Sequence, residues 1–356
     1  MDLRGLAPID CDLHPAVPGM AALLPYMEQH WQDTFIARGI DGLDLALYPP
    51  DAPISCRPDW RRDGEKPGSS LIAMQEQALD GFGARFGILN CIYGGPALYS
   101  EDMGAAVCRA TNDWIRAEWL DREPRLRASI VVPVQNPDLA VAEIERLAGD
   151  RRFVQVLLLA SGELPLGRRQ HWPIYAAAEK HGLPIGIHAG SGNRHAPSGI
   201  GWPPYLIQDH ATYAQTFQTQ LLSLLSEGVF GKFPKLRFVL MESGFTWLPP
   251  FLWRAVKMWR GMRREIPWVE QSPDQIFRER VRITVQPADA PADPVQMAEL
   301  LKMIGSDEML LFSTDYPHWR FEGQDALPPG FDDALVKKIL VDNPLATYPR
   351  LKETLS

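Results

Sequence analysis

The stretch MLLFSTD, residues 309–315, is a short apolar run that ends in an aspartate. Similar runs recur along the chain between longer segments with helical periodicity, and this alternation is the pattern of repeated βα units. The runs predict strands at 9–13, 86–92, 128–133, 153–159, 184–188, 236–242, 281–286 and 309–315. Eight such strands joined by helical crossovers predict an α/β fold of the TIM-type (β/α)₈ barrel class.

Helices are predicted between these strands from periodicity and end signals. The segment 102–122 has apolar side chains on one face, and 137–149 begins after an asparagine and ends at a glycine. Further helices are predicted near 172–181, 210–227, 249–264, 293–304 and 332–341. The whole chain, 1–356, is therefore expected to form a single barrel domain.

Two segments do not fit a simple βα unit. Residues 15–70 are rich in proline and form a predicted insertion after the first strand, with one helix around 19–38. Residues 190–204 (GSGNRHAPSGIGWPP) follow the fifth strand. Because loops that follow barrel strands lie on the face where substrates bind, both segments are expected to wall the active site.

Composition narrows the classes of partner and location. The chain has 356 residues and a formal net charge of -8, which argues against nucleic acid as a partner because phosphate binding needs a basic surface. The sequence has no apolar run of signal-peptide or membrane-span length, so no membrane association is expected. A reducing, cytoplasmic location is expected because the cysteines lack disulfide or zinc-site spacing: Cys11, Cys56, Cys91 and Cys108.

Side chains that can bind metal follow the predicted strands. Asp12 and His14 stand two residues apart at the end of the first strand, so they point to the same side. His188 ends the fifth strand, Glu242 the sixth and Asp315 the eighth. Each of these residues alone has an ordinary structural explanation, such as a loop cap, a core histidine or a turn. Together they predict a cation site in the barrel mouth, because clustered buried carboxylates are costly without a cation.

Several motifs carry a resemblance to a known family. They are IDCDLHP at 9–15, GIHAG at 186–190, VLMESGFTWLP at 239–249, VRITVQP at 281–287, FSTDYPHW at 312–319 and DNPLATY at 342–348. With these motifs the chain resembles the amidohydrolase superfamily over essentially its whole length. Within that superfamily it is similar to the amidohydrolase-related branch, which includes aminocarboxymuconate semialdehyde decarboxylase and resorcylate-type decarboxylases.

The resemblance implies roles for the candidate residues. It makes Asp12, His14, His188 and Asp315 the ligands of one divalent metal ion, and it makes Asp315 the proton carrier as well. Asp12 stands where the founding pattern of the family has a histidine, and Glu242 stands where many members have another. With two imidazoles and two carboxylates, zinc is the expected ion and manganese is its competitor. Glu242 becomes the candidate helper base, so the implied catalytic residues are Asp315, Glu242 and His188.

Three functions are compatible with these residues. The branch implies a non-oxidative decarboxylase, a carbon–carbon lyase acting on a small aromatic or unsaturated carboxylic acid, with Asp315 delivering a proton to carbon. The same residues would serve a metal-dependent hydrolase of an ester, lactone or amide, in which Asp315 or Glu242 takes the proton of the attacking water. An inactive barrel that serves as a binding protein is the third alternative.

Candidates for binding a small-molecule substrate lie in the regions that follow the fifth and eighth strands. Each also has a structural alternative, because most such loop residues are solvated or support the loop itself. Tryptophans beside these loops suggest a planar, aromatic substrate. The candidates are Arg194, His195, Trp202, His210, His318 and Trp319. Barrels of this branch are often dimers, which makes a homodimer the candidate assembly.

Overall fold

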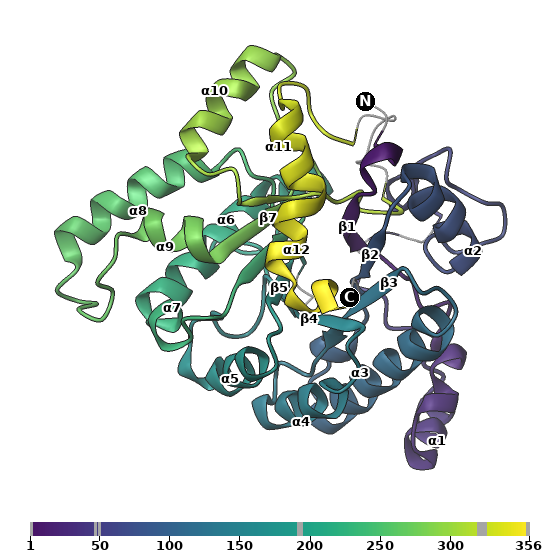
Figure 1. Cartoon of the computed structure of the whole chain (residues 1–356). Coiled ribbons are helices and arrows are strands. Elements are labelled where there is room, and N and C mark those ends of the chain that lie inside the picture. The colour runs from purple at the N-terminus through teal and green to yellow at the C-terminus, as the bar shows by residue number, and fades with distance from the viewer. Residues whose placement is uncertain (1–2, 46–47, 49–50, 191–194, 319–325, 354–356) are drawn as a thin grey trace.

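The strands form a barrel in a computed structural model that describes residues 3–45, 48, 51–190, 195–318 and 326–353. Within these residues, eight parallel strands follow one another in chain order around a nearly closed barrel, as the sequence predicted (Figure 1). The strands are β1 (Ile9–Leu13), β2 (Phe86–Leu89), β3 (Leu126–Val131), β4 (Phe153–Leu159), β5 (Ile185–His188), β6 (Phe238–Met241), β7 (Val281–Thr284) and β8 (Leu310–Leu311).

Backbone hydrogen bonds between β1 and the segment after β8 close the barrel. The amide of Cys11 donates to the carbonyl of Phe312 at 2.9 Å, and the amide of His14 donates to the carbonyl of Tyr316 at 2.8 Å. Leu13 and Tyr316 also form a parallel bridge. The first strand and the segment that follows the last strand therefore meet at the face of the barrel where the strands end.

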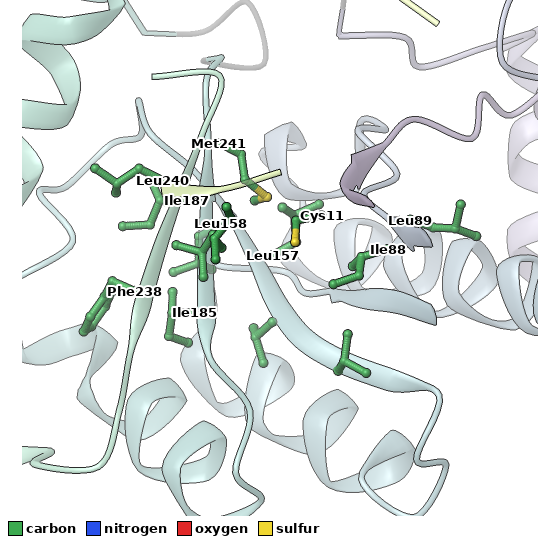
Figure 2. Close-up of a cluster of buried hydrophobic side chains, with 14 of the residues drawn as sticks. Cys11, Ile88, Leu89, Leu157, Leu158, Ile185, Ile187, Phe238, Leu240 and Met241 are labelled. Atoms are coloured by element: carbon green, nitrogen blue, oxygen red, sulfur yellow. The ribbon is translucent and has the colours of Figure 1, made fainter. Parts of the chain in front are cut away.

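The hydrophobic core fills the barrel wall from both sides. Figure 2 shows side chains of several neighbouring strands gathered into one buried cluster. Ile185, Ile187 and Leu240 are fully buried, and every residue of β5 and β6 is buried. Because helices cover the outer face and side chains fill the inner one, the strands read as nearly continuous apolar runs. This is why their positions could be predicted from the sequence.

Helices surround the strands (Figure 1). Asn136 begins one of them, since its side chain accepts hydrogen bonds from the amides of Asp138 and Leu139. No helix in the described part of the chain is long and apolar enough to span a membrane. The helices are α1 (Gln29–Arg38), α2 (Leu71–Met74), α3 (Glu101–Ile115), α4 (Pro137–Leu147), α5 (Trp172–Lys180), α6 (Leu206–Ser226), α7 (Val229–Lys232), α8 (Leu248–Met262), α9 (Pro273–Arg280), α10 (Pro294–Ile304), α11 (Asp333–Lys337), α12 (Asn343–Thr347) and α13 (Pro349–Glu353).

The prediction of one helix around 19–38 is wrong for the first half of that segment. Two short 3₁₀ turns, Met20–Ala22 and Leu24–Tyr26, precede α1, which begins only at Gln29. Pro25 lies in the second turn and has no amide hydrogen to donate, so a continuous α-helix does not pass through it.

Besides the short helices α7 and α13, the sequence analysis missed two helical segments. The first is α2 with its π-helical continuation Gln75–Asp80, which directly follows the proline-rich insertion. The second is α9, a short and highly charged helix (PDQIFRER). It buries only Pro273, Ile276 and Phe277, and so short an apolar face leaves little periodicity to detect.

The insertion after β1 folds back onto the barrel mouth, as expected. Gly68, near its end, accepts a hydrogen bond from the amide of Ala16 at 2.9 Å. Its φ is +78°, and a Cβ atom there would lie 2.5 Å from the carbonyl oxygen of His14. Only glycine fits this close approach. The insertion therefore lies directly against the chain that leaves β1.

Arg350 ties α13 to the opposite end of the barrel. Its buried guanidinium donates to the carbonyls of Phe153 at 2.6 Å and of Ala148 and His181 at 3.1 Å each. These carbonyls lie at or before the beginnings of β4 and β5. One side chain thus provides donors for three backbone groups that are otherwise left at strand entrances.

We predict that Arg350→Ala lowers the free energy of unfolding by about 3 kcal/mol, because buried carbonyls lose charged donors. Urea unfolding followed by circular dichroism measures the change. Arg254→Ala, at an exposed position of α8, is the matched control and should stay within about 0.5 kcal/mol of the parent. An Arg350→Ala protein as stable as the parent would contradict this role.

Candidate metal centre

The five side chains predicted to meet at the barrel mouth do so. Asp12 lies in β1, His14 follows it, His188 ends β5, and Glu242 directly follows β6. Asp315 lies in the segment after β8 that closes the barrel. All five are buried, Asp12 and Asp315 completely.

His14 and His188 face carboxylates across the barrel mouth. The Nε2 atom of His14 lies 3.1 Å from Oδ1 of Asp315 and 3.3 Å from Oδ1 of Asp12. The Nε2 atom of His188 lies 3.5 Å from Oε1 of Glu242 and 3.7 Å from Oδ2 of Asp12. Two overlapping sets of possible metal ligands result, one made by Asp12, His14 and His188. The other contains His14, Glu242, Asp315 and His318.

Backbone carbonyls hold both imidazoles in the orientation that a metal ligand needs. The Nδ1 atom of His14 lies 3.0 Å from the carbonyl oxygen of Asn90, and that of His188 lies 2.7 Å from the carbonyl oxygen of Ala189. A carbonyl can only accept, so each neutral ring carries its proton on Nδ1. The lone pair of each Nε2 atom is then directed into the cluster.

Four buried atoms of this cluster have no hydrogen-bond partner among the described residues. They are Asp12 Oδ2, His14 Nε2, His188 Nε2 and Asp315 Oδ2. Buried polar atoms are normally paired, because an unpaired one loses its interaction with water. One unpaired acceptor on each of the four residues is what a shared divalent cation requires. The residues present therefore fit a metal ion.

The titration behaviour of the cluster agrees with this fit. Burial raises the pKa of Asp12 to about 8, with the charges of Asp315 and Glu242 acting in the same direction. Burial lowers the pKa of His188 to about 4, so its imidazole is neutral and able to bind metal at neutral pH. For His14, burial lowers the pKa, but the carboxylates of Asp12 and Asp315 outweigh it and the net shift is upward.

Asp315 and His318 form a short pair at the edge of the cluster. The Nδ1 atom of His318 lies 2.6 Å from Oδ1 of Asp315 and 3.4 Å from Oε1 of Glu242. Burial lowers the pKa of His318, but these two carboxylates outweigh it and raise the pKa well above its usual value. Asp315 and Glu242 also have left-handed backbone, with φ of 57° and 54°. Such strain in non-glycine residues is typical of functional sites.

Asn90 is a site residue that the sequence analysis missed. It follows β2, and its Nδ2 atom donates to Oδ1 of Asp12 at 2.8 Å while its carbonyl faces His14. Its Oδ1 atom accepts from Ser129 at 2.6 Å and from Gln155 at 3.3 Å. Asn90 thus orients two candidate ligands from one position. The one feature of the sequence that could have indicated this role is the position of Asn90 at the end of the apolar run FGILN.

A cavity of about 210 Å³ opens above the cluster. It is lined by His14, His188, Glu242 and His318 from the barrel, and its wall includes His210, as expected for a substrate-binding residue. The insertion contributes Val17, Asp44, Tyr48 and Lys66, and β4 contributes Leu159. The insertion therefore walls the cavity, in agreement with its predicted place.

Other expected substrate-binding residues are not brought to this cavity. His195 does not line it, and Trp202 is about half exposed at 53%. Trp60, which lies in the proline-rich insertion, is buried against Tyr316 with ring centroids 5.0 Å apart. The expectation that tryptophans line the cavity is wrong for the described residues. Two further candidates, Arg194 and Trp319, lie outside the described residues.

A family model described as amidohydrolase matches residues 9–350. The chain belongs to the amidohydrolase family. Among curated relatives, gamma-resorcylate decarboxylase of Rhizobium sp. (strain MTP-10005) is 27% identical to this amidohydrolase over 220 residues. The match covers 59% of this chain and 65% of that relative, so it spans somewhat less than two thirds of the relative's length.

Solved structures share the barrel of this amidohydrolase. Amidohydrolase map2389c from Mycobacterium avium subsp. paratuberculosis K-10 superposes with a TM-score of 0.69 at 20% identity, covering 96% of this chain and 98% of that one. A dihydroxybenzoic acid decarboxylase from Polaromonas sp. JS666, with bound manganese and the inhibitor 2-nitroresorcinol, superposes with a TM-score of 0.63 at 20% identity. That match covers 96% of this chain and 97% of that one. At this identity the likeness shows the fold.

We predict that the purified amidohydrolase binds about one divalent ion per chain and that His188→Ala loses it, since this imidazole is the candidate ligand that β5 contributes. Inductively coupled plasma mass spectrometry after dialysis measures the metal content. The matched control is His30→Ala, because the His30 side chain is 63% exposed on α1. A His188→Ala protein with parental metal content would remove His188 from the ligand set.

We predict that metal affinity rises with pH up to about 8 and then levels off. Because the pKa of Asp12 is about 8 without the ion, its carboxyl holds a proton below that pH and must release it on binding. Well below this value the affinity for Mn²⁺ should change by up to about tenfold per pH unit. Calorimetry in buffers of different ionisation enthalpy measures the released proton, and Asp12→Asn, which has no such proton, is the control. Affinity independent of pH between 6 and 8 would contradict the prediction.

Proposed function

We propose that this amidohydrolase is a metal-dependent, non-oxidative decarboxylase of a small aromatic carboxylic acid. The observation that carries the proposal is Asp315. It is a completely buried carboxylate that lies 3.1 Å from the His14 imidazole and 2.6 Å from His318 beside the cavity. One side chain thus connects the cation site with a hydrogen-bonded proton donor, which is what protonation of a bound carbon requires.

Asp12, His14, His188 and Asp315 are the proposed ligands of the metal ion, each with an unpaired buried atom. When bound, the ion supplies the positive charge that attracts the carboxylate and a neighbouring oxygen of the substrate. Zinc was the ion expected from the sequence. The manganese in the Polaromonas decarboxylase supports manganese, and a ligand set with two carboxylates suits this harder ion.

The proton is proposed to reach the substrate through Asp315. His318 donates a hydrogen bond to Asp315, so the pair can hold one proton and pass it on. Asp315 delivers this proton to the ring carbon that carries the carboxylate. The carbon–carbon bond then breaks, its electron pair returns to the ring, and carbon dioxide leaves. The overall change is carboxylate plus proton to arene plus carbon dioxide, so atoms and charge balance.

Glu242 is proposed to support the proton donor and to act as a helper base. Its Oε1 atom lies within 3.4 Å of His318 and 3.5 Å of His188, so it bridges the donor and a proposed ligand. A negative charge at this position favours the protonated form of His318. Glu242 would therefore help the Asp315–His318 pair to regain its proton after each turnover.

Decarboxylation is favoured over hydrolysis by the relatives, since the same residues would serve either reaction. The curated relative and the Polaromonas structure both carry the name of a decarboxylase of hydroxylated benzoic acids. The test is to incubate metal-loaded protein with a panel of hydroxybenzoates, aryl esters and lactones, following carbon dioxide and acid release. Ester or lactone turnover without carbon dioxide would overturn the proposal and favour the hydrolase. Protein that binds the compounds and metal without turnover would favour the binding protein.

We predict that Asp315→Asn lowers the rate of carbon dioxide release at least about 1,000-fold while the barrel stays folded, because an amide cannot deliver the proton. Stopped-flow detection of carbon dioxide gives the rate, and circular dichroism checks the fold. Asp307→Asn, at an exposed carboxylate near the start of β8, is the matched control and should keep the parental rate. Near-full activity of Asp315→Asn would rule out the proton role.

Two further expectations belong to this proposal. A cytoplasmic location is supported by the cysteines, all four of which are free and buried. A homodimer stays a prediction, and size-exclusion chromatography with light scattering measures it.

A further inference from the structure

Asp209 is a buried carboxylate that lines the cavity but does not belong to the metal cluster. It lies in the first turn of α6, the helix that follows the loop after β5. Its fractional exposure is 6%, so it is as deeply buried as the candidate ligands. Neither of the possible ligand groups in the described part of the chain includes it. Asp209 therefore needs a different explanation from the carboxylates of the barrel mouth.

Among the described residues, one side-chain donor lies within hydrogen-bond distance of the Asp209 carboxylate. The hydroxyl of Tyr213, one turn along α6, donates to its Oδ2 atom at 2.9 Å. The Nδ1 atom of His210 lies 3.7 Å from the same oxygen, beyond hydrogen-bond distance, and faces the carbonyl of Leu206 at 3.0 Å. A carboxylate has about four acceptor positions, and burying it with few donors is costly. Its remaining acceptor positions can be filled from the cavity that it lines.

The cavity also carries apolar surface suited to a planar ring. Its wall includes Val17, Ile92, Leu159 and Leu206, which offer no donor to Asp209. A ligand held at the metal cluster through its carboxylate would lie against these side chains. The donor that Asp209 lacks would then come from a substituent of that ligand.

The geometry points to Asp209, oriented by Tyr213, as a subsite for a hydrogen-bond donor on the substrate ring, a phenolic hydroxyl or an aromatic amine. This inference rests on the proposed function and names the substrate class: hydroxybenzoates with a second donor substituent that faces α6. A methoxy group at that position has only an acceptor oxygen and would leave Asp209 with the Tyr213 hydroxyl as its one side-chain donor among the described residues. The subsite therefore selects for the free donor and against its methyl ether.

The experiment compares dihydroxybenzoates with their methyl ethers on metal-loaded protein. Isothermal titration calorimetry gives the Kd of 2,4-, 2,5- and 2,6-dihydroxybenzoate and of the corresponding 2-hydroxy-methoxybenzoates. For at least one of the three pairs, the parent protein should bind the free hydroxyl about 100-fold more tightly. If the preference is at ring position 4, comparing 4-amino-2-hydroxybenzoate with 2,4-dihydroxybenzoate shows whether an amine or a hydroxyl is the preferred donor.

Two substitutions of Asp209 test the assignment. Asp209→Leu has no acceptor and should lose the preference or reverse it toward the methyl ether. Asp209→Asn keeps the size and one neutral acceptor, so it should reduce the preference about tenfold and serves if the leucine variant does not fold. In both, metal content should stay at the parental level, because Asp209 is not a proposed ligand.

Tyr213→Phe and Gln215→Ala complete the design. Tyr213→Phe removes the donor to Asp209 and should keep or increase the preference for a donor on the ligand. Gln215→Ala, at an exposed position of the same helix, should leave the ratio of Kd values unchanged.

The outcomes separate this inference from the proposed function. Equal binding of every pair by the parent, or a parental preference in both Asp209 variants, would overturn the subsite. Binding needs no turnover, so a preference lost in the variants without any carbon dioxide release would support the subsite and reject only the decarboxylase. Carbon dioxide release by a protein that binds the hydroxyl and methoxy compounds equally would support the decarboxylase and reject only the subsite.

Discussion

The carboxylate of Asp10 connects the first strand to the last, and the metal centre depends on this connection. Its Oδ1 atom accepts hydrogen bonds from the amides of Asp12 and Thr314, both at 3.1 Å, and its Oδ2 atom accepts from the Thr314 hydroxyl at 2.6 Å. The residues that it fixes neighbour His14 on one side and Asp315 on the other. Burial raises the pKa of Asp10 to about 7, and three donors offset part of that effect. The first strand and the segment after the last strand are therefore held together at the candidate metal centre.

Repulsion between buried carboxylates governs the arrangement of the other side chains at the barrel mouth. Asp12, Glu242 and Asp315 are buried close together, and burial of like charges is unfavourable unless a cation is shared. Hydrogen bonds hold these carboxylates and the neighbouring imidazoles close together and in fixed orientations. The side chain and carbonyl of Asn90 fix Asp12 and His14, and the carbonyl of Ala189 fixes His188. Four of the buried polar atoms that have no hydrogen-bond partner among the described residues belong to this cluster, and a shared divalent ion would offset its excess negative charge.

The cavity extends this arrangement to the buried carboxylate of Asp209 on another element. The residues of the cluster lie at strand ends, whereas Asp209 lies in α6. The apolar wall of the cavity includes residues of both the insertion and the barrel. Strand ends are rigid because both faces of the barrel are packed. The insertion is a connection, which can vary without disturbing the core, whereas α6 packs on the barrel through buried side chains such as Phe217 and Leu221. In this fold the candidate metal centre lies at the strand ends, and the proposed donor subsite lies on α6.

The sequence by itself determined the eight strands and the meeting of Asp12, His14, His188, Glu242 and Asp315, since apolar runs and their polar ends are local signals. Periodicity was too weak for α9, and the proline in the insertion shortened the expected helix. Only the tertiary structure decided that Asn90 orients two candidate ligands, that tryptophans such as Trp60 turn away from the cavity, and that Asp209 lines it. These facts depend on contacts between segments far apart in the chain. Such contacts follow from how the insertion and α6 pack on the barrel, and no local pattern of residues encodes that packing.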